Sequence, residues 1–253
     1  MDMLQCSMSY CRIVMLHLNS PAAAKRWCSE QRDLQKAIGF VPTMGALHKG
    51  HLSLVAKARQ ENATCCVSIF INPLQFEDPE DFKVYPRDTE SDLALLEAHG
   101  CDMVFMGNLD QFFPEVSNID EIETLPAGHH GSGLEERFRP GHLDGVRTIV
   151  ERLFRTVGGS RAYFGEKDFQ QTLVVSDLAR EMGYPEVVVC PTVREDSGLA
   201  LSSRNVLLDA EEINLAKKRY EEIAVETAPI ELTLDRSTYS TGDRVRVNVK
   251  FAN

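Results

Sequence analysis

The sequence predicts an α/β protein, with a doubly wound parallel sheet and a curtailed, atypical C-terminal region. Short apolar runs of strand length alternate along the chain with segments of helical periodicity, and this alternation favours a parallel sheet with helices on both faces. The run at residues 64–71 is apolar enough to be buried on both sides. Hydrophobic residues make up 43% of the 253 residues, which suffices for a substantial core.

Three strands are predicted in the first half of the chain, at residues 38–41, 64–71 and 101–106. A helix is predicted between the first two strands, because Leu47, His51, Leu54, Val55 and Ala58 recur at helical spacing. A second helix is predicted to begin at Thr89, where an acid follows three residues later as in a capping box, and to end near Gly100.

The second half contains the clearest helix, which follows Gly145. Its apolar residues form one unbroken stripe: Val146, Ile149, Val150, Leu153, Phe154 and Val157. A short strand at 161–164, a helix at 168–182 and a strand at 186–190 complete the predicted sheet. In such sheets ligands bind beyond the carboxyl ends of the strands, and each candidate motif lies at such an end.

Two segments, 76–87 and 107–144, are long, polar and rich in Gly and Pro, and they are predicted as loops that are either functional lids or poorly ordered. His142 and the pair His129–His130 fall in the second loop and are read as solvated. Seven cysteines without zinc-type spacing, and the lack of a signal peptide or membrane-length apolar run, predict a cytoplasmic protein.

The formal net charge is −11. This charge argues against broad attraction to nucleic acid or to an anionic membrane, so neither is expected as a partner. An anionic ligand must therefore be held by a local cluster of donors.

The segment PTMGALHKGH, residues 42–51, follows the first predicted strand directly. His48 and His51 are three residues apart and share one face at a helix start. The N–H groups of a helix N-terminus suit a phosphate, and each imidazole can donate a hydrogen bond to phosphate oxygens, more strongly if protonated. Gly50 is expected to leave the backbone open to a flat ligand. The alternative is a pair of half-buried surface histidines, but the position straight after a strand favours a phosphate site.

This segment resembles the HIGH-type signature of the adenylyl-transferring α/β superfamily. The longer resemblance is to the pantoate–β-alanine ligases. It continues through FINPLQF at 70–76, YPRDTESDLALLEAHGCDMVF at 85–105, RPGHLDGVRTIVERLF at 139–154, RAYFGEKDFQQ at 161–171 and VREDSGLALSSRN at 193–205. Six ordered blocks cover roughly residues 35–210, which makes the match specific.

The resemblance implies a Rossmann-like fold and a reaction in two steps. Pantoate attacks the α-phosphorus of ATP to give pantoyl adenylate and pyrophosphate, and β-alanine then displaces AMP to give pantothenate. It also implies a magnesium ion that accompanies ATP and a homodimer joined through the nucleotide-binding domains.

Carried over residue by residue, the resemblance places ATP-binding groups in three segments. The first is Met44, Gly45, Ala46, Leu47, His48, Lys49, Gly50 and His51. The second is Gly165, Glu166, Lys167 and Asp168. The third is Leu201, Ser202, Ser203 and Arg204, with Val193 near the adenine.

Four of these residues are expected to be catalytic: His48, His51, Lys167 and Arg204. His51 is the usual proton donor of the family, Lys167 offers a point charge to phosphate, and Arg204 is expected to stabilise the departing pyrophosphate. Asp168 can accept from ribose hydroxyls. Without the neighbouring motifs, Lys167 and Asp168 are a capping Asp beside an exposed Lys.

Amide side chains are expected to bind the two small substrates. Gln75 and Gln171 correspond to the pantoate-contacting residues of the family, and Gln75 with Asn72 borders the β-alanine site. An amide both donates and accepts, which suits a hydroxyl-bearing substrate.

Three domains are predicted. Residues 1–190 form the nucleotide- and pantoate-binding domain, 191–228 begin a C-terminal domain with the phosphate loop, and 229–253 form an atypical β tail. Residues 206–226 keep the pattern of the helix that opens the second of these. In the tail, Val245, Val247, Val249 and Phe251 alternate with polar residues as in a half-buried strand, after a YSTGD turn at 239–243. The tail looks like the start of an immunoglobulin-like β module.

Three functional hypotheses remain open on the sequence. The first is an ATP-dependent ligase that makes pantothenate. The second is a non-catalytic nucleotide- or partner-binding protein, because the C-terminal domain is expected to be incomplete. The third keeps the adenylyl chemistry with another acceptor, as in a nucleotidylyltransferase or a tRNA-synthetase core, although the acidic charge argues against RNA.

Overall fold

The computed structural model describes residues 14–215 and the two strands at 230–234 and 247–251. The chain divides into two units, one comprising residues 1–193 and 201–204, the other 194–200 and 205–253. The predicted division at 190 and 228 stays a prediction. None of the described helices is long and apolar enough to cross a membrane.

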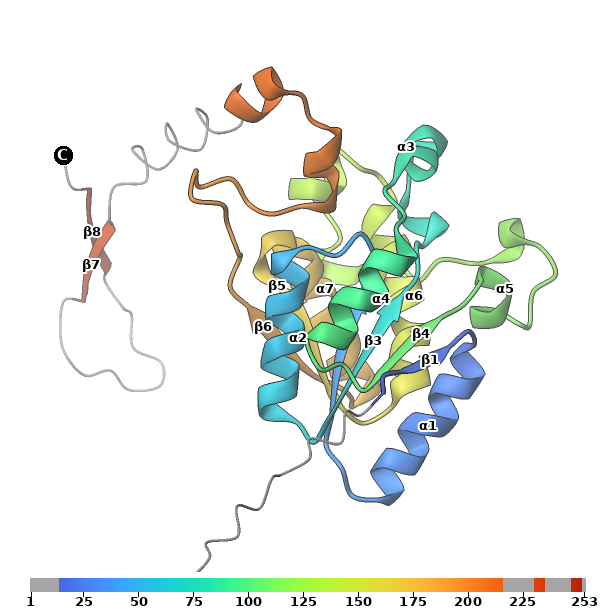
Figure 1. Cartoon of the computed structure of the whole chain (residues 1–253). Helices are drawn as coiled ribbons and strands as arrows, with labels where there is room; N and C mark the ends of the chain where they lie inside the picture. The colour runs from blue at the N-terminus through green and yellow to red at the C-terminus, as the bar shows by residue number, and fades with distance from the viewer. Residues whose placement is uncertain (1–13, 216–229, 235–246, 252–253) are drawn as a thin grey trace, which may run out of the picture. The chain divides into compact units, whose positions relative to one another are not determined.

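The first unit is built on a parallel sheet whose order is β1-β4-β3-β2-β5-β6 (Figure 1). Its strands are β1 (Leu16–Leu18), β2 (Ile38–Thr43), β3 (Thr64–Ile69), β4 (Met103–Met106), β5 (Arg161–Gly165) and β6 (Glu186–Cys190). All six residues of β3 are buried, as its continuous apolar run predicted. The strand β1 was not predicted.

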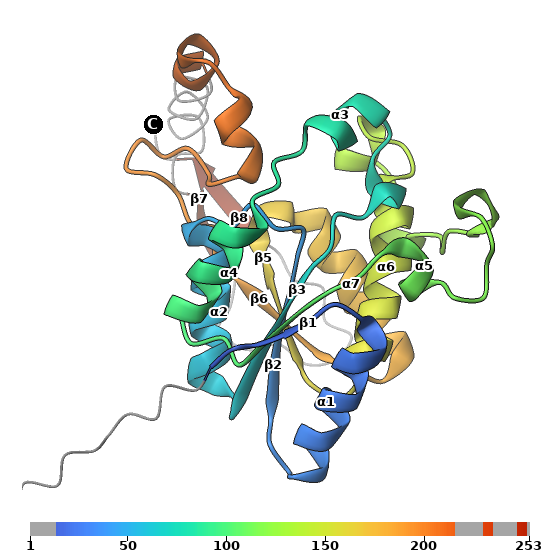
Figure 2. The same ribbon diagram turned by 45° about the vertical axis from the view of Figure 1, so that its right-hand side comes forward.

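Helices cover both faces of this sheet (Figure 2), which confirms the doubly wound α/β prediction. The helices α1 (Pro21–Asp33), α6 (His142–Val157) and α7 (Phe169–Met182) pack on one face with β-strand residues such as Phe40 and Phe105. The helices α2 (Lys49–Glu61) and α4 (Thr89–Ala98) pack on the other face, against residues such as Val41 and Val67. The whole predicted stripe of α6 is buried.

Two local predictions were wrong. Asp88, not Thr89, caps α4, because the Asp88 carboxylate accepts the Ser91 N–H. The predicted loops at 76–87 and 107–144 also contain short helices, α3 (Pro79–Val84) and α5 (Leu109–Phe112) among them, and α6 begins inside the second at His142. The helix α1, which follows a Ser20 cap, was not predicted.

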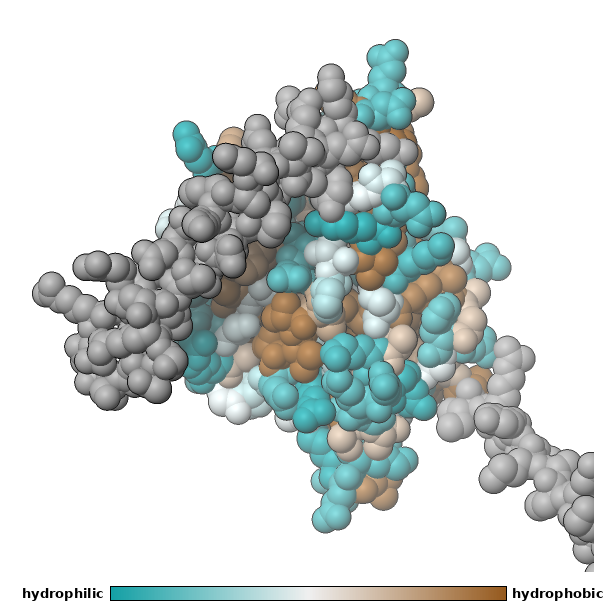
Figure 3. All heavy atoms as spheres, turned by 90° about the vertical axis from the view of Figure 1, so that its left-hand side faces the viewer, coloured by the Kyte–Doolittle hydropathy of each residue, from teal (hydrophilic) through white to brown (hydrophobic). Residues whose placement is uncertain are grey.

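The sheet order reverses between β2 and β5: the chain builds outward from β2 through β3 to β4, and then from β5 to β6 on the other side. The carboxyl ends of β2 and β5 therefore face one crevice, where open α/β sheets bind their ligands. Seen from the β6 side, the surface carries a hydrophobic patch among hydrophilic residues (Figure 3), and Val189 of β6 is exposed.

In the second unit, residues 210–215 are helical, while the rest of the helix predicted at 206–226 beyond 215 lies outside the described residues. The strands β7 (Ile230–Leu234) and β8 (Val247–Phe251) pair antiparallel, with Ile230 opposite Phe251. The strand predicted from Val245 to Phe251 is confirmed for Val247–Phe251, and Val245 lies outside the described residues. The YSTGD turn and the immunoglobulin-like character of the tail fall outside the described residues.

Candidate active site

A cavity of about 210 Å³ lies at the carboxyl ends of β2 and β5, at the reversal of the strand order. The segments that follow β2, β3 and β5 contribute to its wall, together with the amino end of α6 and residues 201–204. Most of the residues singled out in the sequence line it. They are Met44, His48, Gly50, His51, Asn72, Gln75, Gly165, Lys167, Asp168, Gln171, Val193, Leu201, Ser202, Ser203 and Arg204.

Five of the predicted nucleotide-contacting residues do not line this cavity: Gly45, Ala46, Leu47, Lys49 and Glu166. Lys49 and Glu166 are exposed. Leu47 packs against the core under α2 and α4. The contacts expected of these five stay predictions. Gly45 and Ala46 lie beside the carboxylate of Asp92, which accepts the Ala46 N–H.

His48 and His51 are locked together at the start of α2. His48 is the N-cap, and its Nδ1 accepts the Gly50 N–H at 3.1 Å; the Nδ1 of His51 accepts the His48 N–H at 3.3 Å. The two ring centroids are 4.1 Å apart. A ring nitrogen that accepts a backbone N–H carries no proton, so in each neutral ring the proton is on Nε2. Both histidines therefore offer an Nε2–H donor.

Burial keeps both rings uncharged. It lowers the pKa of His51 to about 3, and the adjacent His48 and the Lys167 ammonium act in the same direction. Burial also lowers the pKa of His48, with Lys167 acting in the same direction and Asp168 against it. Near neutral pH the site thus contains two neutral donors. Protonated imidazoles, which donate more strongly and which the sequence left open, are disfavoured here by burial.

The reason for glycine at position 50 differs from the one expected. A side chain there would meet the ring of His48 first, because a Cβ at Gly50 would lie 2.9 Å from both Cε1 and Nδ1 of that ring. Gly50 therefore permits the capping arrangement of His48. The cap also occupies the Gly50 N–H, so this helix N-terminal donor is not free for a phosphate.

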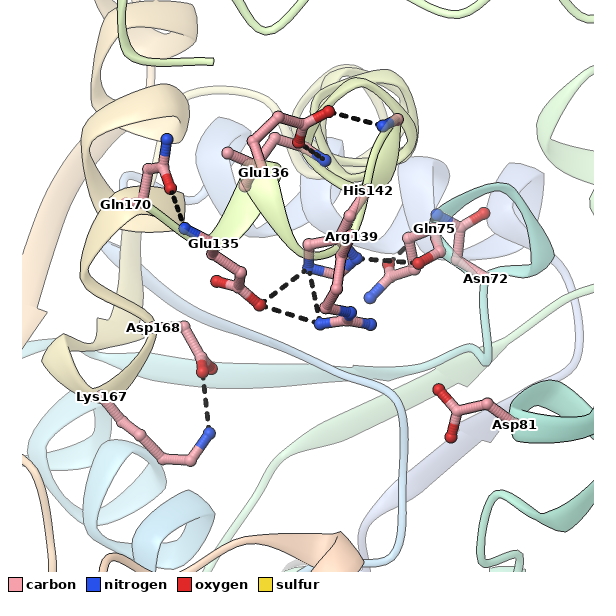
Figure 4. A network of polar contacts seen from close by, with 12 residues as sticks. Asn72, Gln75, Asp81, Glu135, Glu136, Arg139, His142, Lys167, Asp168 and Gln170 are labelled. Atoms are coloured by element: carbon pink, nitrogen blue, oxygen red, sulfur yellow. Dashed lines mark hydrogen bonds and ion pairs between the residues drawn. The ribbon is translucent and has the colours of Figure 1, made fainter. Parts of the chain in front are cut away.

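The turn after β5 brings Lys167 and Asp168 to the cavity (Figure 4). The Lys167 ammonium donates to Oδ1 of Asp168 at 2.7 Å, and both side chains are more than a third exposed. Because the pair is exposed and therefore weak, an anion that enters the cavity can displace Asp168 and pair with the Lys167 ammonium.

Arg204 is held in a similar way. Its guanidinium donates to both carboxylate oxygens of Asp81, at 3.2 and 2.9 Å, and lies 5.2 Å from the ring centroid of Tyr85. The neighbouring Ser203 hydroxyl donates to the Ala46 carbonyl at 2.9 Å, which joins residues 201–204 to the loop after β2.

Amide groups form a third part of the wall. Asn72 donates through Nδ2 to Oε1 of Gln75 at 3.1 Å and to the Gly145 carbonyl at 3.1 Å. This leaves the Nε2 of Gln75 for a ligand. Of the two adjacent glutamines in α7, Gln171 lines the cavity, whereas Gln170 binds the backbone of the loop at 130–135.

Beside the amides lies a charged cluster that sequence reasoning missed (Figure 4). Arg139 donates to Glu135 at 2.8 Å and approaches the Nε2 of His142 at 3.2 Å, while the Nδ1 of His142 lies 2.8 Å from the Gln75 carbonyl. A carbonyl only accepts, so His142 carries its proton on Nδ1.

The prediction that His142 is solvated was therefore wrong. His142 begins α6 and is buried, and burial lowers its pKa. One sequence signal for the cluster was available: Glu135 and Arg139 are four residues apart, the spacing of a helical ion pair.

The match to a protein-family model identifies the chain. The model described as pantoate–β-alanine ligase matches residues 17–246, a range that continues past the last recognised motif at Asn205. The pantothenate synthetase of Cytophaga hutchinsonii is 39% identical over 240 residues, which cover 94% of this chain and 82% of the relative. The enzyme of Herpetosiphon aurantiacus is 47% identical over 210 residues, 82% of this chain and 71% of the relative.

Solved structures agree. A crystal structure of pantothenate synthetase from Thermus thermophilus superposes with a TM-score of 0.71 at 38% identity, covering 94% of this chain and 95% of that one. The pantoate–β-alanine ligase of Francisella tularensis, crystallised with β,γ ATP and β-alanine, gives a TM-score of 0.72 at 31% identity, with 94% and 98% covered. The chain therefore belongs to the pantoate–β-alanine ligase family, and its activity is the ligation of pantoate and β-alanine to form pantothenate.

Proposed function

We propose that the protein binds ATP in this cavity and makes pantothenate through a pantoyl adenylate. A carboxylate oxygen of pantoate attacks the α-phosphorus, and the bond from that phosphorus to the bridging oxygen of pyrophosphate breaks. The amine of β-alanine then attacks the carbonyl carbon of the mixed anhydride, loses a proton and displaces AMP. The observation that carries the proposal is one cavity in which neutral donors, cations and amides all meet.

In this proposal His48 and His51 donate from Nε2 to the oxygens of the α-phosphate. Negative charge builds up there in the transition state, and each fixed donor contributes about 3–4 kcal/mol. Because the Nδ1 atoms are already engaged, the donors need no rearrangement at the moment of reaction. The low pKa of His51 favours a hydrogen-bond donor that stays neutral over transfer of its proton.

Lys167 and Arg204 bind the β- and γ-phosphates in this proposal, and Arg204 stabilises the departing pyrophosphate. Both are cations whose present partners are carboxylates at the cavity, Asp168 and Asp81. Exchange of a carboxylate for a phosphate keeps each cation paired. Asp168, once released, is placed to accept from the ribose, and Val193 is proposed to lie against the adenine.

Pantoate is assigned to Gln75 and Gln171, and β-alanine to Gln75 and Asn72. The chemistry adds Arg139, which lines the same end of the cavity. When the β-alanine amine faces the activated carbonyl, the carboxylate of β-alanine points away from it and requires a cation.

Magnesium is proposed to enter with ATP as part of the substrate. Within residues 14–215 no group of three or more His, Cys, Asp or Glu is arranged to hold a metal ion. Mg²⁺ typically keeps several waters and binds substrate phosphates with one or two carboxylates, and Asp168 is a carboxylate that lines the cavity beside Lys167.

The homodimer and the cytoplasmic location belong to the same proposal. Exposed apolar side chains, that of Val189 in β6 among them, offer surface for a second copy to cover. The described thiols of Cys28, Cys65, Cys66, Cys101 and Cys190 are free and buried, which fits a reducing compartment. Sedimentation of the purified protein tests the dimer.

Product analysis tests the reaction. Incubation with ATP, pantoate and β-alanine should yield AMP, pyrophosphate and pantothenate in equal amounts, and omission of β-alanine should leave enzyme-bound pantoyl adenylate. A folded protein that binds ATP but releases no pyrophosphate would instead support the non-catalytic hypothesis. Equal pyrophosphate release with acids other than pantoate would support a different acceptor.

A further inference from the structure

The loop that carries the histidines lies between two cavities. Residues 44–48 connect β2 to α2, and behind residues 44–46 is a second cavity of about 380 Å³. Met44, Gly45 and Ala46 line this rear cavity together with the ends of β3 and β4. Side-chain packing therefore leaves space behind the loop, and other contacts must hold it in place.

The backbone of this loop is held by one carboxylate. Asp92, which is 3% exposed, accepts the Ala46 N–H at 2.8 Å through Oδ2 and the Leu47 N–H at 2.7 Å through Oδ1. Gly45 has a φ of +81° and Ala46 a φ of +49°. Such positive values are uncommon outside glycine and persist when the surroundings impose them.

The carboxylate of Asp92 does not cap α4, the helix to which Asp92 belongs. The N-cap of α4 is Asp88, whose Oδ1 accepts the Ser91 N–H at 3.0 Å. Asp92 lies one turn further on and points inward, and both of its oxygens bind the loop after β2. Two acids with the same chemistry on the same helix thus have separate partners.

We propose that Asp92 is a positioning residue: its carboxylate holds the loop so that His48 and His51 present their Nε2–H groups to the α-phosphate. The second anchored amide, that of Leu47, directly precedes His48. The Ala46 carbonyl accepts a hydrogen bond from the Ser203 hydroxyl. By holding Ala46, Asp92 therefore also helps to position residues 201–204. This inference rests on the proposed adenylation step.

The test is Asp92→Asn, with Asp88→Asn as the matched control. In Asp92→Asn the new side-chain NH₂ group would face a backbone N–H, so at least one loop hydrogen bond is lost. We expect kcat for pyrophosphate release from ATP and pantoate to fall about 100-fold, a loss that misplacement of catalytic groups by about 1 Å can cause. KM for pantoate should stay within about twofold, because its proposed amide partners lie on other elements. Asp88→Asn should leave kcat unchanged, because Asn caps a helix about as well as Asp.

Equal kcat values in Asp92→Asn and Asp88→Asn would overturn the inference, as would a loss confined to KM. Wild type and His51→Ala belong in the same assay. If wild type releases no pyrophosphate, the proposed function fails; if His51→Ala is inactive while Asp92→Asn is fully active, only the positioning role fails.

Should Asp92→Asn not fold by circular dichroism, Gly45→Ala is the second variant. A Cβ at Gly45 would lie 2.9 Å from Oδ2 of Asp92 and 3.1 Å from Ile69, so it displaces the loop from the carboxylate. The same fall in kcat at constant pantoate KM is expected, and wild-type kcat in a folded Gly45→Ala protein would contradict the inference.

Discussion

The two sides of the proposed phosphate site are built differently. On one side, His48 and His51 are uncharged, and each uses one ring nitrogen to hold the backbone, so that the other is fixed as a donor. On the other side, Lys167 and Arg204 are charged, partly exposed and already paired with Asp168 and Asp81.

This difference separates two tasks. Fixed neutral donors stabilise charge that develops during reaction without reorganising, and are expected to act on kcat. Cations that must exchange a carboxylate for a phosphate contribute to holding the nucleotide, and their contribution falls as salt rises. The following variants test whether the two sides divide the work in this way.

The largest effect is expected for His51→Ala. Loss of one fixed donor should lower kcat by about 100- to 1,000-fold with little change in ATP affinity. Steady-state kinetics and calorimetric ATP binding measure the two quantities, and His129→Ala, an exposed histidine, is the control. A loss in ATP binding as large as the loss in kcat would show that His51 merely holds the ground-state nucleotide.

A smaller effect, mainly on KM for ATP, is expected for Arg204→Lys. The lysine keeps the charge but loses the forked donor geometry, so KM for ATP should rise about tenfold, within the range of a hydrogen bond to a charged group. Because Arg204 is also proposed to stabilise the departing pyrophosphate, kcat should fall as well, but less than in His51→Ala. Raising the salt concentration should increase KM for ATP in both proteins, because the lysine keeps the charge. If salt leaves KM of both proteins unchanged, the cation side does not bind phosphate as proposed.

Stability should depend on pH through His51. The unfolded chain takes up a proton on this residue near pH 6.5, whereas the folded protein keeps it neutral until about pH 3. The unfolded state binds more protons in that window, so the free energy of unfolding falls as pH falls from about 6.5 towards 3, by at most about 1.4 kcal/mol per pH unit.

Urea unfolding of wild type and His51→Gln at neutral and acidic pH measures this slope. The variant lacks the titrating ring and should lose less stability on acidification. Identical losses in the two proteins would mean that His51 is protonated in the folded state near its ordinary pKa.

The smallest effect is expected for Asp81→Asn. Removing the carboxylate frees the Arg204 guanidinium from a pair that is about one-third exposed. Such pairs contribute about 0.2–1 kcal/mol, so KM for ATP should fall by up to about fivefold. Asp78→Asn, which affects the cap of the same short helix, is the control. A rise in KM for ATP would show that Asp81 assists nucleotide binding.

The sequence predicted five of the six strands of the sheet, because each follows from a local pattern, and the family resemblance supplied many of the residues that line the cavity. The continuous apolar run at β3 is enough to predict a buried strand, and the apolar stripe at α6 is enough to predict a helix. The histidine motif lies directly after β2, so the general rule for parallel sheets places it at the crevice.

The contacts that organise the site were not predicted, because they join residues far apart in the chain. Asp92 has the pattern of an ordinary acid in the first turn of a helix, and nothing local indicates that it binds Ala46 and Leu47. His142 was missed because its segment has a loop composition, although α6 begins there.

The most direct test of the account is the protonation of His48 and His51. In ¹⁵N-labelled protein at neutral pH, both rings should be neutral with the proton on Nε2, and addition of a non-hydrolysable ATP analogue should shift both Nε2 resonances. Charged rings, protons on Nδ1, or Nε2 signals that ignore the nucleotide would contradict the claim that two fixed neutral donors face the α-phosphate.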